Sequence, residues 1–406
     1  MPEPSPAVPW PDPPPAVCRV LATLAGAGHE AVLVGGCLRD LRLGRPVLDW
    51  DVATSGAPEA VLALFPRAVP IGLRHGTVMV PGAAGPVDVT TFRGPDLGAD
   101  LARRDFTVNA MAWTSDPPGW LDPEGGLRDL GARTIRAVRS APDRLAEDPL
   151  RALRAVRLAA ELGFALDPAL AEALPSAARV IGGVARERVR VELERVLLAR
   201  DAGRGLALLR EAGLERALVG SPVAADAPAV VAALPPDLTL RLAAWLRGRD
   251  AGALLARLRF PRQRTGEVAE LVRLHPIERG RAPSDLGRLW LRVGRTGVDR
   301  LLALREAELA AEPRPSAASA AAREALAELR SAALAIERAG LLAKGRPRLA
   351  VGGEEVMAWL GLPPGPAIGR ALRYLTLAVL REPERNEPAA LRALLGAWRE
   401  SEGDAE

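Results

Sequence analysis

The first third of the chain alternates between short apolar runs and helical patterns. Between residues 16 and 28 the apolar positions recur at helical spacing, and four later runs have the length and composition of strands. Gly-rich and Pro-rich breaks separate these runs, as expected of turns. The expected strands are residues 30–34, 49–53, 77–80 and 87–92, with a tight turn at Gly35-Gly36, a helical segment at 37–43 and a hairpin at 81–86. This pattern predicts a small α/β unit over about the first 135 residues.

After residue 141 the apolar positions follow a helical period almost to the end of the chain. Amphipathic helices are expected over residues 143–162, 169–178 and 186–200, with short Gly or Pro breaks between them. Aromatic residues make up only 3% of the chain, so its cores depend on Leu, Ala and Val, and Ala and Leu favour helices. The pattern predicts a largely helical remainder.

Charge and cysteine content restrict the function only weakly. The net charge is +4 and the basic residues are almost all Arg, which permits nucleic-acid binding but also fits a coding bias towards Arg. Cys18 and Cys37 have no metal-ligand spacing, which suits a reducing cytoplasm. The Pro-rich start of the chain has no apolar run, and later apolar stretches are broken by Arg or Glu, so neither a signal peptide nor a membrane span is expected.

Two aspartates on the second expected strand are the first candidates for catalysis. Asp49 and Asp51 stand two residues apart, so on a strand they point to the same face. Two carboxylates side by side repel each other, and Mg²⁺, which prefers oxygen ligands, relieves that repulsion. An isolated Asp-x-Asp is more often a solvated strand end, so this pattern needs support from its surroundings.

That support comes from the turn before the strand. The backbone of Gly35 and Gly36 allows close approach of a triphosphate, and Arg39 follows at a distance suited to a phosphate contact. Asp88, on the strand over residues 87–92, is a candidate third carboxylate, with a surface aspartate as the alternative. Together these groups predict phosphoryl-transfer chemistry with bound metal.

The segment over residues 103–112 adds further nucleotide-binding candidates. Arg104 suits a phosphate or sugar contact, Asp105 suits a sugar hydroxyl or an arginine, and Asn109 completes the candidate set. As a bare pattern, the segment equally fits a capped helix.

A charged series over residues 147–157 predicts base recognition. Asp148, Arg151, Arg154 and Arg157 stand three residues apart, so on a helix they would share one ridge. A carboxylate accepts from the amino group of cytosine or adenine, while a guanidinium donates to the neighbouring acceptor. An Asp-x-x-Arg pair therefore selects C and A over U and G, with Arg154 and Arg157 left to hold the triphosphate or to order Asp148. The alternative is a solvated charged stripe.

At this point the chain resembles the class II CCA-adding tRNA nucleotidyltransferases, which belong to the DNA polymerase β-like superfamily. The resemblance rests on ordered motifs over about half of the chain, and the segment over 351–369 is similar to the family's tail domain. The matching motifs are residues 34–44 with 49–54, 103–112, 122–130, 147–164 and 186–193.

The resemblance implies an α/β nucleotidyltransferase head, with a small mixed sheet, followed by an all-α neck, body and tail. It implies Mg²⁺ at Asp49 and Asp51, CTP and ATP as substrates, tRNA as partner and pyrophosphate release. Nucleotide contacts are implied for Gly36, Arg39, Arg104, Asp148, Arg151, Arg154 and Arg157. The expected domains are a disordered N-terminus (1–15), head (16–138), neck (139–200), body (201–275), tRNA-binding tail (276–395) and disordered C-terminus (396–406).

The sequence departs from the family pattern in one segment, so it does not decide which nucleotides are added. Only residues 93–102 separate the strand from the Arg-Arg-Asp motif, where family members usually carry a longer flexible loop linked to the switch from C to A addition. CC addition, full CCA addition and A addition all stay open. The residues at 72–77 differ from the Gly-Arg-Arg-Phe usual in bacterial poly(A) polymerases, which are one alternative; a catalytically decayed tRNA-binding protein is another. The three histidines form no His-Asp doublet, so no HD phosphohydrolase activity is expected.

Overall fold

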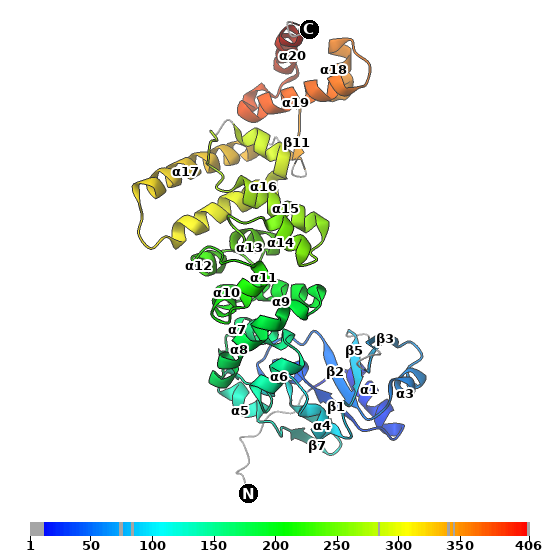
Figure 1. Ribbon diagram of the computed structural model, residues 1–406. Helices are drawn as coiled ribbons and strands as arrows, with labels where there is room; N and C mark the ends of the chain where they lie inside the picture. The colour runs from blue at the N-terminus through cyan, green and yellow to red at the C-terminus, as the bar shows by residue number, and fades with distance from the viewer. Residues whose placement is uncertain are drawn as a thin grey trace. The chain divides into compact units, whose positions relative to one another are not determined.

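The computed structural model describes residues 12–72, 76–82, 85–282, 285–338, 342–343 and 346–403. The chain forms two compact units (Figure 1). The first contains the chain up to Val196 together with residues 208–220, and the second contains residues 197–207 and the chain from Ser221 onwards. The expected head and most of the expected neck therefore pack as one unit. The finer boundaries between neck, body and tail stay predictions.

A seven-stranded mixed sheet forms the centre of the first unit, in the order β3-β4-β5-β2-β1-β6-β7. Only β2 and β5 pair in parallel; every other neighbouring pair is antiparallel. The four expected strands are present, and three short strands that the sequence pattern did not indicate extend the sheet at both edges. The strands are β1 (Ala31–Val34), β2 (Trp50–Thr54), β3 (Val69–Gly72), β4 (Thr77–Val80), β5 (Val87–Thr91), β6 (Ala112–Ser115) and β7 (Pro118–Leu121).

The two faces of this sheet pack against different helices. The larger core includes Trp50 and Val52 of β2, Val87 and Val89 of β5, and apolar side chains of α1 (Pro15–Gly26) and α3 (Pro58–Leu64). The smaller core lies on the other face, where Ala53 packs with Leu97 and Leu101 of α4 (Leu97–Leu101). Because strand side chains alternate, Asp51 and Asp88 point to the face that carries α4.

Short elements connect the sheet to the helices that complete the first unit. The segment over 103–112 is not a capped helix: it contains only the 3-10 turn η2 before β6 begins. The remaining elements here are α2 (Gly36–Arg42), η2 (Thr107–Asn109), α5 (Gly126–Gly131), β8 (Thr134–Ile135), α6 (Ala141–Glu147), α7 (Leu150–Leu162), β9 (Ala165–Leu166), α8 (Pro168–Val180), η3 (Ile181–Gly183), α9 (Arg186–Leu198) and α11 (Leu214–Val219).

The single helix expected over residues 143–162 is wrong, because α6 ends at Glu147 and α7 begins at Leu150. Asp148 between them has an extended backbone, with φ −147° and ψ 100°. It precedes Pro149, whose ring clashes with a helical conformation of the residue before it. The break therefore removes Asp148 from the helix that carries Arg151.

The second unit is mainly helical, and α10 spans the boundary between the units. Gly294, with φ +69°, interrupts α16. The elements are α10 (Ala202–Glu211), α12 (Ala227–Ala233), α13 (Leu238–Trp245), α14 (Ala251–Arg257), α15 (Arg262–Leu274), α16 (Leu286–Ala311), α17 (Ala317–Arg338), β10 (Leu342–Ala343), β11 (Arg346–Pro347), α18 (Gly353–Leu360), α19 (Pro366–Arg381), η5 (Pro383–Arg385) and α20 (Pro388–Gly403).

The C-terminal segment is more ordered than expected. Disorder from residue 396 is wrong up to Gly403, because α20 continues through that stretch. Leu391 and Leu395 are buried one helical turn apart, and Trp398 packs against Tyr374 of α19 with ring centroids 6.3 Å apart. These apolar contacts explain why the helix continues. At the other end, residues 1–11 of the expected disordered start lie outside the described residues.

Two further expectations concern membranes and cysteines. None of the described helices is both long and apolar enough to cross a membrane. Cys18 is exposed and Cys37 is buried, and both are free thiols. Burial raises the pKa of Cys37 to about 12, so this thiol stays protonated beside β2.

Candidate active site

Asp51 and Asp88 form the centre of the candidate site. The parallel pairing of β2 with β5 places these two residues directly opposite each other, and both point to the α4 face of the sheet. Asp49 lies just before β2 and is exposed. The structure therefore brings together all three aspartates that the sequence singled out.

The pKa values show that these carboxylates interact. Burial raises the pKa of Asp51 to about 6; Arg104 opposes that rise, while the charges of Asp88 and Asp49 add to it. Burial and the charge of Asp49 likewise raise the pKa of Asp88. Carboxylates whose pKa is raised by neighbouring carboxylates favour the approach of a cation.

The donor set suits a hard divalent cation but does not form a complete cage. Among the described residues, no group of three or more His, Cys, Asp or Glu side chains is gathered closely enough to hold a metal ion. Mg²⁺ usually needs only one or two protein carboxylates, because substrate phosphates and water supply its other ligands. Asp49 and Asp51 are two carboxylates of the kind that Mg²⁺ uses, and the ligand roles of Asp49, Asp51 and Asp88 all stay predictions.

The turn at Gly35 lies directly against Asp51 and Arg104. Gly35 has φ +80°, a region that favours glycine, and a Cβ atom there would lie 3.0 Å from Nη1 of Arg104 and 3.2 Å from Oδ2 of Asp51. Arg104 is held by Asp100, whose Oδ2 accepts from Nε at 3.2 Å and from Nη2 at 3.0 Å. The positively charged guanidinium of Arg104 is thus held beside Asp51, where the triphosphate is expected to bind.

Arg39 is engaged within the protein. It is buried, its Nη1 donates to Oδ1 of Asn109 at 2.7 Å, and it pairs with Asp40 at 2.8 Å. Nη2 of Arg39 lies 3.4 Å from the position that a Cβ on Gly36 would take. Arg39 and Asn109 therefore join α2 to η2, and their predicted nucleotide contacts stay untested.

Asp105 is likewise committed to an internal partner. Its Oδ2 accepts from Nη2 of Arg154 at 2.6 Å and from Nε at 2.8 Å, and its Oδ1 accepts from Nδ2 of Asn109 at 3.1 Å. Burial opposes ionisation of Asp105, but these donors outweigh it and hold its pKa below the ordinary range. Of the two roles predicted for Asp105, the structure shows the one in which it holds an arginine.

Arg157 packs between helices. Its side chain is only 5% exposed, with Nε 2.8 Å from Oε2 of Glu192 and Nη1 3.5 Å from Oε2 of Glu161. Neither Nε of Arg157 nor Oε2 of Glu192 makes a hydrogen bond, so the contact between these two residues is an ion pair without hydrogen-bond geometry. The predicted contact of Arg157 with the triphosphate has no support in this arrangement.

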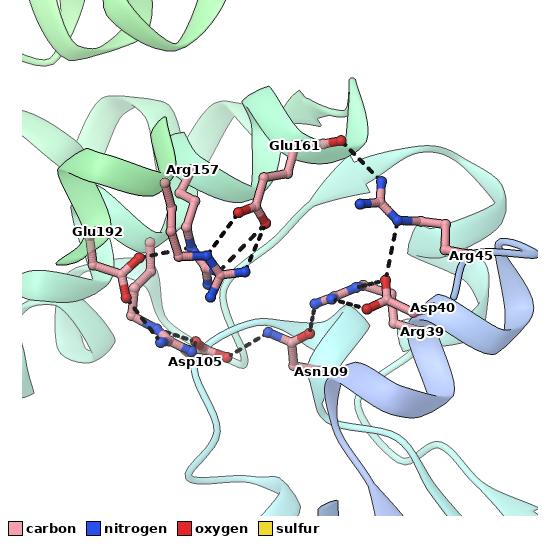
Figure 2. Close-up of polar contacts among 10 residues, drawn as sticks. Arg39, Asp40, Arg45, Asp105, Asn109, Arg157, Glu161 and Glu192 are labelled. Atoms are coloured by element: carbon pink, nitrogen blue, oxygen red, sulfur yellow. Dashed lines mark hydrogen bonds and ion pairs between the residues drawn. The ribbon is translucent and has the colours of Figure 1, made fainter. Parts of the chain in front are cut away.

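These pairs form one closed polar circuit, shown in Figure 2. Glu192 of α9 pairs with both Arg154 and Arg157, and Nη1 of Arg45 donates to the backbone oxygen of Glu161 at 3.1 Å. Because Arg45 also lies 3.7 Å from Asp40, the circuit returns to its start. Its members in order are Asp40, Arg39, Asn109, Asp105, Arg154, Glu192, Arg157, Glu161 and Arg45. The circuit ties the sheet region to α7 and α9.

The base-reading pair has a different geometry from the predicted ridge. Asp148 lies before α7, where its Oδ1 accepts from the backbone N–H of Leu150 at 3.1 Å and its Oδ2 accepts from Nη2 of Arg188 at 2.6 Å. Arg151 lies in the first turn of α7 and pairs with Glu147 at 2.7 Å. Asp148 and Arg151 remain close in the chain but are held by separate partners.

Four residues that support the site were not among the sequence candidates. Asp100 fixes Arg104, Glu192 anchors Arg154 and Arg157, and Arg188 holds Asp148. Glu192 and Arg188 lie in the motif over residues 186–193, where the i, i+4 spacing of opposite charges was the available signal.

The fourth is Arg93. Burial lowers its pKa, and the charges of Arg104 and Arg151 lower it further, although Asp100 opposes this change. Three guanidinium groups therefore converge near the site. Only the three-dimensional arrangement reveals this, because Arg93 belongs to no motif.

Comparison with known proteins assigns the chain to a family. The model of the poly A polymerase head domain matches residues 31–136, and that of the probable RNA- and SrmB-binding site of polymerase A matches residues 163–226. The CC-adding tRNA nucleotidyltransferase of Shouchella clausii (strain KSM-K16) is 41% identical over 217 residues, which is 53% of this chain and 57% of that protein.

Several matches extend over almost the whole chain, and two of them carry the family assignment. The CCA-adding enzyme of Geobacillus stearothermophilus is 35% identical over 404 residues, which covers 93% of this chain and 95% of that protein. The crystal structure of the Bacillus stearothermophilus CCA-adding enzyme in complex with CTP matches with a TM-score of 0.74 at 32% identity, covering 97% of this chain and all of that one. With this likeness from end to end, the chain belongs to the family of CCA-adding tRNA nucleotidyltransferases.

Proposed function

We propose that this chain adds C residues from CTP to the 3′ end of tRNA, with Asp49 and Asp51 at the reacting phosphate. The main observation in support is that Asp51 and Asp88 lie opposite each other on paired strands, with Asp49 and Arg104 close to them. Full-length likeness to a CCA-adding enzyme, and to one solved with CTP, supports the substrate.

The reaction joins the tRNA 3′ oxygen to the α-phosphorus of the nucleotide. That new P–O bond forms as the bond from the α-phosphorus to the oxygen bridging to the β-phosphorus breaks, the hydroxyl loses its proton, and pyrophosphate leaves. Mg²⁺ held by Asp49 and Asp51 would neutralise phosphate charge and make the hydroxyl more acidic. Asp51, partly buried beside Asp88, supplies the site with the negative charge that such an ion needs.

Arg93 and Arg104, which both pair with Asp100, supply the complementary charge for the triphosphate. Arg104 is fixed by Asp100 and touches the Gly35 turn, so its position is set before the nucleotide arrives. A guanidinium placed in advance binds phosphate without a further ordering cost.

Asp148 and Arg151 are proposed to read the base. The carboxylate of Asp148 accepts from the amino group of cytosine or adenine and repels the carbonyl oxygen of uracil or guanine. Both residues lie at the start of α7, near Arg103 of the head motif, whose backbone oxygen accepts from Nη2 of Arg151 at 3.3 Å. This contact connects the base-reading region to the segment that carries Arg104.

Whether A follows the two C residues depends on the segment between β5 and Arg103. In this chain it contains α4, capped by Asp96 and packed against the sheet through Leu97 and Leu101, and Asp100 binds Arg93 and Arg104. So compact a segment favours CC addition, since a longer flexible loop is what the family resemblance associates with the switch to A. Full CCA addition and A addition are the other outcomes.

The decisive experiment supplies tRNA ending before, within or after CC, with Mg²⁺ and either CTP or ATP alone, and measures product length. The proposal expects extension of the first two tRNAs by CTP, and loss of extension when the metal is chelated. Extension of tRNA ending in CC by ATP identifies a full CCA-adding enzyme, while A addition without C addition contradicts the proposed CTP step.

A poly(A) polymerase is the second candidate, because the matching head model carries that description. The residues around 73–75 that argued against it in the sequence lie outside the described residues. An oligo(A) primer with ATP separates the two functions: the polymerase makes long tails on it, whereas the tRNA enzyme leaves it unextended. A decayed binding protein transfers no label from α-labelled CTP to any primer.

A further inference from the structure

One face of α9 carries three charged side chains at helical spacing that match opposite charges on Asp148, just before α7, and along α7 itself. Arg188 contacts Asp148, Glu192 contacts Arg154 and Arg157, and Arg195 contacts Glu161 with Nε 3.0 Å from Oε1. The contacts follow the same order along both helices. The polar circuit already contains the Glu192 contacts and Glu161, but the contact of Arg188 ends on Asp148, the residue proposed to read the base.

Two donors on opposite oxygens fix the orientation of the Asp148 carboxylate. The backbone N–H of Leu150 binds Oδ1 at 3.1 Å, and the Arg188 guanidinium binds Oδ2 at 2.6 Å. A carboxylate has about four acceptor positions, so these contacts leave room for the amino group of a base. Removing either donor frees the carboxylate to rotate.

Arg151 does not take part in this arrangement. It pairs with Glu147 at 2.7 Å and donates to the backbone oxygens of Arg144 and Arg103. The orientation of Asp148 therefore depends on α9 and on the backbone of α7 rather than on its partner in base reading.

We propose that Arg188 is a positioning residue that orients Asp148 for the amino edge of the incoming base, and so sets discrimination between CTP and UTP. This inference rests on the proposed function, in which Asp148 reads the base. The Arg188 side chain is 55% exposed, and an ion pair this open contributes little to folding. Its effect is expected in selectivity rather than in stability.

The test measures kcat/KM for CTP and for UTP on tRNA lacking its CC end, using the full-length protein. Arg188→Ala is expected to lower the CTP-to-UTP ratio about tenfold, the scale of one charge-assisted hydrogen bond. Arg188→Lys keeps a positively charged hydrogen-bond donor but lacks the planar guanidinium, so it is expected to restore part of the CTP-to-UTP ratio. The unfolding midpoint and the Kd for tRNA should stay near those of the parent protein.

Arg195→Ala is the matched control. It lies on the same helix, is 52% exposed and also pairs with one carboxylate of the α7 region, but not with Asp148. Its CTP-to-UTP ratio should equal that of the parent protein. A general weakening of the contact between α7 and α9 would instead lower the ratio in both variants and overturn the assignment.

Asp148→Ala separates failure of this inference from failure of the proposed function. If Asp148→Ala loses selectivity and Arg188→Ala does not, the positioning role is wrong and base reading by Asp148 stands. If Asp148→Ala keeps full selectivity, base reading itself is wrong. A rise in kcat/KM for CTP in Arg188→Ala would show that Arg188 competes with the nucleotide for Asp148, which also overturns the proposal.

Discussion

Asp51 on β2 and Asp88 on β5 lie opposite each other across the only parallel strand pair of the seven-stranded sheet. Their position on a partly buried face raises the pKa of both carboxylates, that of Asp51 to about 6. The folded protein without metal therefore holds an unfavourable negative charge at the place where the proposed reaction would use one, and this arrangement has measurable consequences.

Asp51→Asn should abolish nucleotide incorporation and yet raise the stability of the metal-free protein at pH 8. Since the pKa of Asp51 is higher in the folded state than in the unfolded state, its ionisation destabilises the fold as pH rises from about 4 through about 6. The gain on removing the charge is about 1–3 kcal/mol. Urea unfolding in chelator measures it, and equal stabilities at pH 8 would contradict the pKa shift.

Gly35→Ala should cost most of the activity. The residue has φ +80°, and its new Cβ would meet Nη1 of Arg104 and Oδ2 of Asp51 within 3.2 Å. The control is Gly28→Ala, where φ is +81° but nothing lies within 4 Å of the new atom. Both variants should lose about 1 kcal/mol of stability through backbone strain. Only Gly35→Ala should also lose kcat, and equal activity in the two variants would exclude the steric argument.

Arg157→Met should lower the free energy of unfolding by about 2–3 kcal/mol, because it leaves the buried Glu192 with one cation in place of two. KM for CTP should change little, since Arg157 packs between helices. The exposed Arg195→Met, which also loses a contact with Glu161, should cost less than 1 kcal/mol. A large rise in KM with unchanged stability would instead support the triphosphate contact suggested by the sequence.

Asp105 should stabilise the protein in a pH-dependent way. Its pKa is lower in the folded state than in the unfolded state, so its contribution is complete above about pH 4 and is lost as pH falls below that value. Asp105→Asn should therefore be less stable than the parent protein at pH 7, with the difference shrinking towards pH 3. Thermal unfolding at several pH values checks this, and a difference independent of pH would show that the carboxylate charge is not responsible.

Asp148→Ala and Arg151→Ala should loosen the choice of base more than they weaken tRNA binding. Asp148 also accepts from the backbone N–H of Leu150, so its removal should cost about 1 kcal/mol of stability as well. Two quantities are measured for each variant: the rate of misincorporation of U and G, and the Kd for tRNA. Unchanged base choice at reduced tRNA affinity would point to a role in RNA contact.

The sequence predicted β2 and its neighbouring strands well, for a local reason. The alternation along β2 places Asp51 on the face opposite Trp50 and Val52, and the sequence patterns identified four strands correctly in type. Asp49 lies just before β2, so the expectation that it shares a face with Asp51 stays a prediction. It failed at the Asp148-Pro149 break, where the charged series suggested one continuous helix. There the conformational restriction before proline outweighed the helical pattern.

What the sequence by itself determined is the set of chemical groups and their local spacing: the aspartate pair, the glycine turn, and the arginines of the motifs. Which of those arginines remain available was decided only by the tertiary structure. Arg154 and Arg157 have the same spacing as Arg151. Arg151 pairs with the nearby Glu147, whereas Asp105 and Glu192 reach Arg154 and Arg157 from distant segments and neutralise them. A buried cation must find a carboxylate, and no local pattern reveals which distant carboxylate will reach it.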